Sequence, residues 1–290
     1  GGGLSRCTKK KAQGPGGAAG ERPGPAQQAP RQEAAASAPP RRGPKGEGAD
    51  YWLYGRHAVE AALANPARNL RRLLLAESPD EALARKLATL RLPLGPEVVG
   101  RAALEGTLPP GAVHRGLALR AEPLFQPSLP VFLAELRDRA AVILALDHVT
   151  DPQNVGAILR SAAAFGAAAV LCTVDHAPPE GGALAKTASG GLEVVPYLRE
   201  TNLVRSLELL KQAGFWCFGL AEQGEGLLSG VEAGARACLV LGAEGEGLRR
   251  LTRERCDALV RLPTRPPIAS LNVSNAAAVA LYELLGRERT

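Results

Sequence analysis

The chain alternates short runs of consecutive apolar residues with longer segments in which apolar residues recur every three or four positions. The apolar runs occupy residues 142–146, 168–173, 215–220, 238–241 and 259–262. The amphipathic segments occupy residues 154–166, 181–191, 202–213, 248–255 and 272–287. Runs that are apolar on both faces are typical of parallel strands covered by helices on both sides. Residues 140–290 are therefore predicted to form an α/β domain built on a parallel sheet.

The preceding part of the chain has shorter elements. Residues 50–122 are predicted to form a small α/β domain, with helices at 55–64 and 79–90 and strands at 71–76, 97–99 and 116–121. This part carries nine basic residues: Arg56, Arg68, Arg71, Arg72, Arg85, Lys86, Arg91, Arg101 and Arg115. They fit a patch that holds phosphates and equally fit an ordinary solvated face. Both interpretations stay open from the pattern alone.

Two segments lack the composition of a folded domain. Residues 1–48 contain 18 Gly or Pro and no aromatic residue, so the sequence predicts a disordered basic tail. Residues 123–139 are predicted to be a linker, with three prolines before position 131, followed by a lead-in helix at 131–139.

Charge is unevenly distributed along the chain. The formal net charge is +6, but residues 1–48 hold nine of the 35 Lys/Arg and three of the 29 Asp/Glu. The remainder has 35 − 9 = 26 basic and 29 − 3 = 26 acidic residues, and hence no formal net charge. Any nucleic-acid surface there must be a local patch. No apolar run approaches the roughly 20 residues of a membrane helix, so no membrane span is expected.

The cysteines indicate a reducing compartment. There are five, an odd number, with no C-x-x-C pair, which favours neither a disulfide framework nor a zinc site. Cys172, Cys217 and Cys238 lie in apolar runs, where free cysteine acts as a small hydrophobic residue. We expect a cytoplasmic protein without a metal.

The turn after the run 142–146 carries polar residues that a plain connection would not need. Asn154 is expected at the N-cap of the next helix, and Gly156 allows close approach to the first turn. Arg160 lies in a helix otherwise rich in Ala, Ile and Leu. Because burying an unpaired charge is costly, Arg160 is interpreted as a functional residue.

Two further turns are unusual. Residues 242–247 contain three glycines and two glutamates, and the carboxylates would repel a triphosphate. A ligand with a ribose, an adenine edge or a positive centre fits better. In residues 263–276, Ser270 or Asn272 is expected to cap the final helix.

Three stretches in this order resemble the sequence motifs of the SpoU/TrmH family of the SPOUT superfamily of RNA 2'-O-methyltransferases. They are DPQNVGAILRSAAAFGA, LVLGAEGEGLRRLTRERCD and VRLPTRPPIASLNVSNAAAVALYE. YGRHAVEAAL and HRGLALRA are similar to the small RNA-binding domain of the RlmB-type branch, which methylates a guanosine of 23S rRNA.

The resemblance implies a parallel sheet with a C-terminal deep trefoil knot and a homodimer whose interface contains the final helix. It implies S-adenosylmethionine as the methyl donor, bound at Gly242, Leu262 and Leu271, with no metal and with RNA rather than DNA as the partner. The catalytic set it implies is Asn154, Arg160, Glu244, Ser270 and Asn272.

For Arg160 the family proposals suggest a base. We expect it to stay cationic, since the guanidinium pKa exceeds about 12. It would hold the target phosphate while Asn154 and Glu244 position it. Three alternatives remain: a tRNA 2'-O-methyltransferase of the same fold, a catalytically silent RNA-binding or assembly factor, and an ordinary nucleotide-binding module. The acidic glycine turn argues against the last.

Overall fold

The computed structural model describes residues 49–89, 95–231, 234–267 and 270–286. The predicted tail, residues 1–48, lies outside the described residues. Within them, none of the helices has the length and apolar character needed to cross a membrane.

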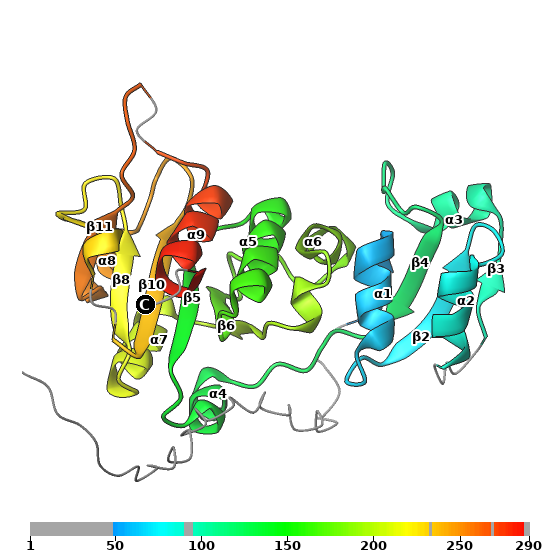
Figure 1. Cartoon of the computed structure of the whole chain (residues 1–290), viewed down its shortest axis with the longest axis horizontal. Helices are drawn as coiled ribbons and strands as arrows, with labels where there is room; N and C mark the ends of the chain where they lie inside the picture. Colours follow the sequence, from blue (N-terminus) through cyan, green and yellow to red (C-terminus); the bar gives the residue numbers. More distant parts are fainter. Residues whose placement is uncertain (1–48, 90–94, 232–233, 268–269, 287–290) are drawn as a thin grey trace, which may run out of the picture. The chain divides into compact units, whose positions relative to one another are not determined.

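The larger part of the fold is a seven-stranded sheet in the order β7-β6-β5-β10-β8-β11-β9, and every neighbouring pair is parallel (Figure 1). Its strands are β5 (Ala141–Asp147), β6 (Ala169–Thr173), β7 (Tyr197–Glu200), β8 (Trp216–Leu220), β9 (Gly226–Leu227), β10 (Arg236–Gly242) and β11 (Ala258–Arg261). All seven residues of β5 are buried, as expected for a central strand covered on both faces. The prediction of an α/β fold with a parallel sheet is confirmed.

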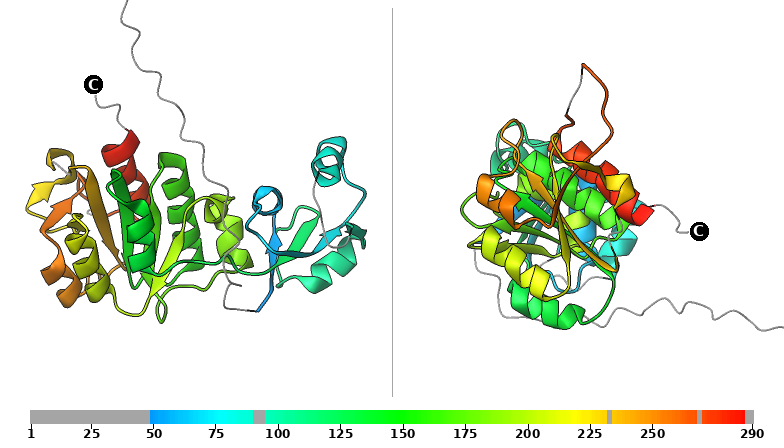
Figure 2. Two further views of the ribbon diagram at one scale, coloured as in Figure 1. Left: turned by 90° about the horizontal axis from the view of Figure 1, so that it is seen from below. Right: turned by 90° about the vertical axis from the view of Figure 1, so that its left-hand side faces the viewer.

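Helices cover both faces of this sheet. They are α4 (Leu129–Leu136), α5 (Pro152–Phe165), α6 (Gly182–Ala188), α7 (Leu203–Gln212), α8 (Arg250–Arg255) and α9 (Val273–Leu281), which continues as a π-helix over Tyr282–Gly286. Leu144 and Leu146 of β5 share a core with α5, α6 and α9, whereas Ile143 and Ala145 share another with α4 and α7. Figures 1 and 2 show α5 and α9 side by side on the first of these faces.

A second, four-stranded sheet has the order β1-β4-β2-β3, with antiparallel pairs except for β2 and β3. Its elements are β1 (Tyr51–Tyr54), α1 (Arg56–Ala64), β2 (Leu70–Leu75), α2 (Glu81–Ala88), β3 (Glu97–Val98), α3 (Arg101–Thr107) and β4 (Leu117–Ala121). The sequence pattern predicts three of these strands and two of these helices. It misses β1 and α3, as it misses β7 and β9 in the larger sheet.

One predicted cap is wrong. Asp151, not Asn154, is the N-cap of α5, and its side chain accepts a hydrogen bond from Gln153 N. Pro152 follows as the first helical residue, where a missing N–H costs nothing. Asn154 therefore lies within the first turn of α5, and its side chain is free to bond elsewhere.

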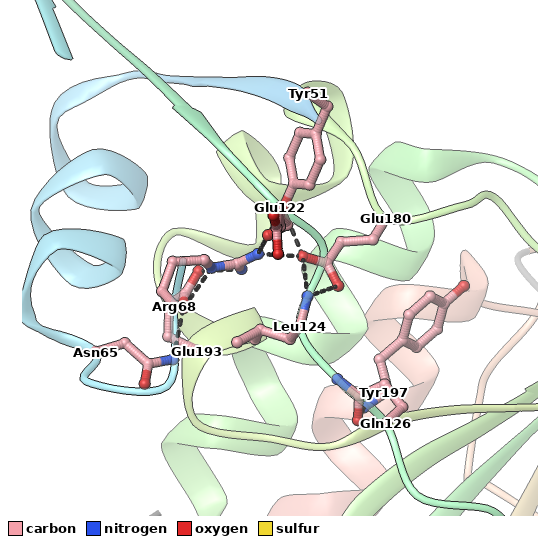
Figure 3. Close-up of polar contacts among 9 residues, drawn as sticks. All are labelled: Tyr51, Asn65, Arg68, Glu122, Leu124, Gln126, Glu180, Glu193 and Tyr197. Carbon is pink, nitrogen blue, oxygen red and sulfur yellow. Dashed lines mark hydrogen bonds and ion pairs between the residues drawn. The ribbon is translucent and has the colours of Figure 1, made fainter. Parts of the chain in front are cut away.

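Arg68 also differs from expectation, because it is not on the surface. Its side chain is fully buried and forms ion pairs with Glu180 and with Glu193 at 2.5 Å (Figure 3). It also donates to the hydroxyl of Tyr51 at 3.1 Å and to the backbone carbonyl of Glu122 at 2.9 Å. Burial alone would lower the pKa of Arg68, but Glu180 and Glu193 outweigh it and raise that pKa. Arg68 thus joins the segment before β2 to the segments flanking α6, and cannot belong to an RNA-binding patch.

Candidate active site

The candidate residues gather at the carboxyl edge of the larger sheet, beside β5 and β10. From this central pair the strands continue towards β6 and β7 on one side and towards β8 and β11 on the other. The segments that follow β5 and β10 pack on opposite faces of the sheet. Helix α5, after β5, belongs to one hydrophobic core, and the segment before α8, after β10, belongs to the other. Parallel sheets bind their ligands at such a switch point.

Three side chains from the three unusual turns meet there. The amide of Asn154 donates to Glu244 Oε1 at 3.1 Å, and the amide of Asn272 donates to Asn154 Oδ1 at 3.1 Å and to Glu244 Oε1. The oxygen of Asn272 accepts from Ser274 N at 2.9 Å and so caps α9, as expected. Both asparagines present amide hydrogens to one carboxylate, and the three turns are held in one arrangement.

A cavity of about 530 Å³ opens beside this network. Its walls come from the segments after β8, β10 and β11 and from the start of α9. Six of the eight predicted site residues line it: Gly242, Glu244, Leu262, Ser270, Leu271 and Asn272. Cavities of this size are in the range that binds cofactors. Glu222, Glu244 and Glu246 bring three carboxylates to the lining, and Arg253 and Arg261 bring two guanidinium groups. The remaining formal charge of the lining is negative, which suits a cationic ligand.

Gly242 is required by the turn that closes this cavity. A Cβ atom there would lie 2.1 Å from the carbonyl carbon of Gly247 and 2.4 Å from Leu248 N. Gly245 has φ 80° and Gly247 has φ 68°, which L-residues with a side chain rarely adopt. The turn therefore folds back on its own strand, and its glycines permit this close backbone approach.

The end of β5 is tied to the start of α8. Asp147 is fully buried and accepts from Arg249 N at 2.9 Å and from Arg249 Nε at 2.6 Å. The ring of the next residue, His148, packs against that of His176, with ring centroids 3.7 Å apart and the ring planes tilted by 38°. Burial and the charge of Arg249 lower the pKa of His148. Asp147 and Arg249 are not among the predicted site residues, although a carboxylate at the end of an apolar strand is a signal in the sequence.

Arg160 is placed apart from this network. It is exposed on α5, and neither it nor Asn154 is among the described residues that line the cavity. No polar contact between Asn154 or Glu244 and Arg160 occurs within the part of the chain that the structure describes. The prediction that Arg160 is a costly buried charge is therefore wrong, since Arg160 is exposed and α5 is not buried on all sides.

Known proteins show what this arrangement is similar to. Residues 141–282 match the model of the SpoU rRNA Methylase family. A 23S rRNA (guanosine-2'-O-)-methyltransferase RlmB of Pseudomonas aeruginosa is 39% identical over 244 residues, which cover 82% of this chain and 96% of that protein. The protein of the same name from Coxiella burnetii is 36% identical, with 80% and 94% covered.

Solved structures show the same fold. The SpoU methyltransferase AviRb from Streptomyces viridochromogenes, in complex with the cofactor AdoMet, superposes with a TM-score of 0.68 at 22% identity. The match covers 82% of this chain and 89% of that one. It therefore includes residues outside the larger sheet.

Proposed function

We propose a function from one premise: the chain belongs to the SpoU rRNA methylase family. It transfers a methyl group from S-adenosylmethionine to the ribose 2'-hydroxyl of a guanosine in 23S rRNA. The observation that carries the proposal is the cavity at the carboxyl edge of the sheet, which contains six of the predicted site residues and adjoins the Asn154–Glu244–Asn272 network.

The cavity fits the cofactor chemically. S-adenosylmethionine supplies an electrophilic methyl group on a positively charged sulfonium centre. Gly242, Leu262 and Leu271 would hold it mainly through backbone groups, while the carboxylates of the cavity complement its positive charge. Ser270 and Asn272 would lie next to the reacting hydroxyl.

The ribose hydroxyl is a poor nucleophile near neutral pH, so the site must align it with the methyl group and let its proton leave as the new bond forms. In this proposal Arg160 remains cationic, holds the target phosphate and polarises the hydroxyl, and solvent takes the proton. Asn154 and Glu244 would keep the first turn of α5 and the turn after β10 in register with the cofactor.

A homodimer would explain why Arg160 lies outside its own cavity. Leu271, Val279 and Tyr282 are exposed apolar residues next to or on the final helix, with 39%, 45% and 52% of their surface accessible. Pairing through this helix would cover them and bring Arg160 of one subunit towards the cavity of its partner. We propose further that the C-terminal segment forms the trefoil knot of the family, and that residues 50–122 bind the RNA.

The test is methyl transfer from radiolabelled S-adenosylmethionine to unmodified 23S rRNA and to bulk tRNA, with nuclease mapping of the product. We expect label at one 2'-O-methylguanosine of the rRNA and its loss in Arg160→Ala. Arg255→Ala is the matched control, because Arg255 is an exposed arginine paired with Glu208 outside the site.

Each other outcome overturns a stated part of the proposal. Label on tRNA would keep the chemistry and change the substrate. Absence of label despite S-adenosylhomocysteine binding would favour a silent RNA-binding factor. In Arg160→Lys, a large loss of activity at unchanged RNA affinity would exclude simple charge positioning and favour a role that depends on guanidinium geometry.

A further inference from the structure

A second cavity lies at the same edge of the sheet. It measures about 290 Å³ and is formed by the end of β6, the start of α7 and the start of α8. The residues of its lining that matter here are Thr173, His176, Asn202, Arg249, Arg250 and Thr252. None of these belongs to the catalytic or cofactor set described above.

Two buried hydroxyls in this lining lack a partner. Thr252 is 0% exposed and Thr173 is 5% exposed, and neither Oγ1 has a hydrogen-bond partner within the described residues. A buried hydroxyl without a partner is unfavourable, and proteins rarely keep one unless a ligand or water satisfies it. Two of them in one cavity indicate a polar ligand.

The charge around the cavity selects an anion. Arg249 and Arg250 bring two guanidinium groups, and α7, a helix of ten residues, directs its positive N-terminal end towards the cavity through Leu203 and Val204. Asp175 is the one carboxylate in the lining, within the described residues, and it is exposed to solvent. Arg249 donates both its backbone N–H and its Nε to the carboxylate of Asp147, which fixes the orientation of the side chain.

We infer that this cavity binds a backbone phosphate of the RNA substrate, away from the methylated nucleotide. The inference rests on the proposed function for the identity of the polyanion. Hydroxyl, guanidinium and helix N-terminal donors are the groups that proteins use for phosphates. Arg249 lines this cavity, and Leu248, the residue before it, lines the first cavity. A bound phosphate would thus set the register of the RNA relative to the reacting ribose.

The first experiment removes the hydroxyls. In Thr173→Val with Thr252→Val, the dissociation constant for an unmodified 23S rRNA fragment should rise about tenfold, the effect of losing one or two hydrogen bonds to a charged group. Thr187→Val is the control, because its hydroxyl bonds to Ala183 O outside the cavity. Tm and S-adenosylhomocysteine affinity should not fall in either protein. Wild-type RNA affinity in the double variant would overturn the inference.

The second experiment uses two arginines of the same helix. Arg250 and Arg255 are both exposed and each pairs with a glutamate, but Arg250 lines the cavity, and Arg255 is absent from its described lining. Arg250→Gln should reduce the slope of log K against log salt by about 0.7 to 0.9, the contribution of one phosphate contact. Arg255→Gln should leave the slope unchanged. Equal losses in both variants would indicate diffuse surface charge and refute a specific site.

These binding measurements are independent of catalysis. If wild-type protein methylates 23S rRNA and the variants bind RNA normally, only the phosphate site is refuted. If wild-type protein binds RNA with the predicted dependence on Arg250 and Thr252 but transfers no methyl group, the proposed function is refuted and the phosphate site stands.

Discussion

At the scale of single residues, Asn272 combines a structural and a functional contact in one amide. Its oxygen caps α9, while its nitrogen bonds to Glu244 and Asn154. In Asn272→Ala the lost cap should lower the free energy of unfolding by about 1 kcal/mol. The rate of methyl transfer should fall as well, because Glu244 loses a donor. Urea unfolding and kcat/KM measure the two effects separately.

Two variants separate these roles. The side chain of Asp80 caps α2 by accepting a hydrogen bond from Leu83 N. Asp80→Ala removes this cap and should lower the free energy of unfolding without reducing kcat. Asn272→Asp keeps an oxygen for the cap but places a second carboxylate against Glu244, so stability should largely recover and activity should not. Wild-type activity in Asn272→Asp would contradict the role assigned to this contact.

The cysteines provide a second prediction at this scale. Burial raises the pKa of Cys172 to about 11 and that of Cys256 to about 12, and Cys217 and Cys238 are buried. At pH 8 only about one Cys172 thiol in a thousand would be ionised. In a Cys7→Ser variant, iodoacetamide should label the native protein far more slowly than the unfolded chain, as mass spectrometry would show. Rapid labelling of one native cysteine would indicate a reactive thiol.

At the scale of elements, the turn after β10 depends on Gly242. In Gly242→Ala the new Cβ would collide with backbone atoms of Gly247 and Leu248, which cannot move aside as a side chain can. We expect the dissociation constant for S-adenosylhomocysteine, measured by calorimetry, to rise more than about tenfold. About 1.4 kcal/mol of strain in the bound state is enough for a tenfold rise. Gly230→Ala is the control, because a Cβ there meets nothing within 4 Å. Equal affinities would show that the turn adapts.

The elements that the sequence predicted are those with a long, regular pattern. The central strands β5 and β10 are apolar on both faces apart from Asp147 at the end of β5 and Arg236 at the start of β10, and they were predicted to within a residue or two. Strand β9 has only two residues, and the four residues of β7, YLRE, include two charged ones. Neither strand therefore shows the apolar run or the alternation by which a strand is predicted from sequence. The cap of α5 was missed although Asp151-Pro152 is a typical helix start.

At the scale of the whole molecule, the site depends on contacts that sequence patterns do not contain. The bond from Asn154 to Glu244 spans 90 residues, and the bond from Asn272 to Asn154 spans 118. The turns could be recognised separately, and the rule that parallel strands present their carboxyl ends together placed them at one edge. Which side chains touch depends on strand order, which no local pattern determines. Arg68 illustrates the same limit, since its partners Glu180 and Glu193 are 112 and 125 residues away in the sequence.

The Arg68 cluster therefore gives a prediction about the chain as a whole. Arg68→Met would leave Glu180 and Glu193 buried without their counter-charge, a change that typically costs about 3 to 5 kcal/mol. Arg68 precedes β2 of the smaller sheet, and both glutamates flank α6 of the larger one, so the cluster links the two sheets. In Arg68→Met we therefore expect the two sheets to unfold in separate transitions. Calorimetry of the wild type should show one transition.

A matched arginine makes this result specific to burial. Arg72 lies on β2 and pairs with Glu97, but both side chains are exposed to solvent, which screens their attraction. Arg72→Met should therefore leave Tm and the single transition unchanged. Adding Glu180→Gln and Glu193→Gln to Arg68→Met removes the uncompensated charges and should restore part of the lost stability. If Arg68→Met alone unfolds like the wild type, the cluster does not couple the sheets, and their association must depend on the other contacts that α6 makes with β1 and α1.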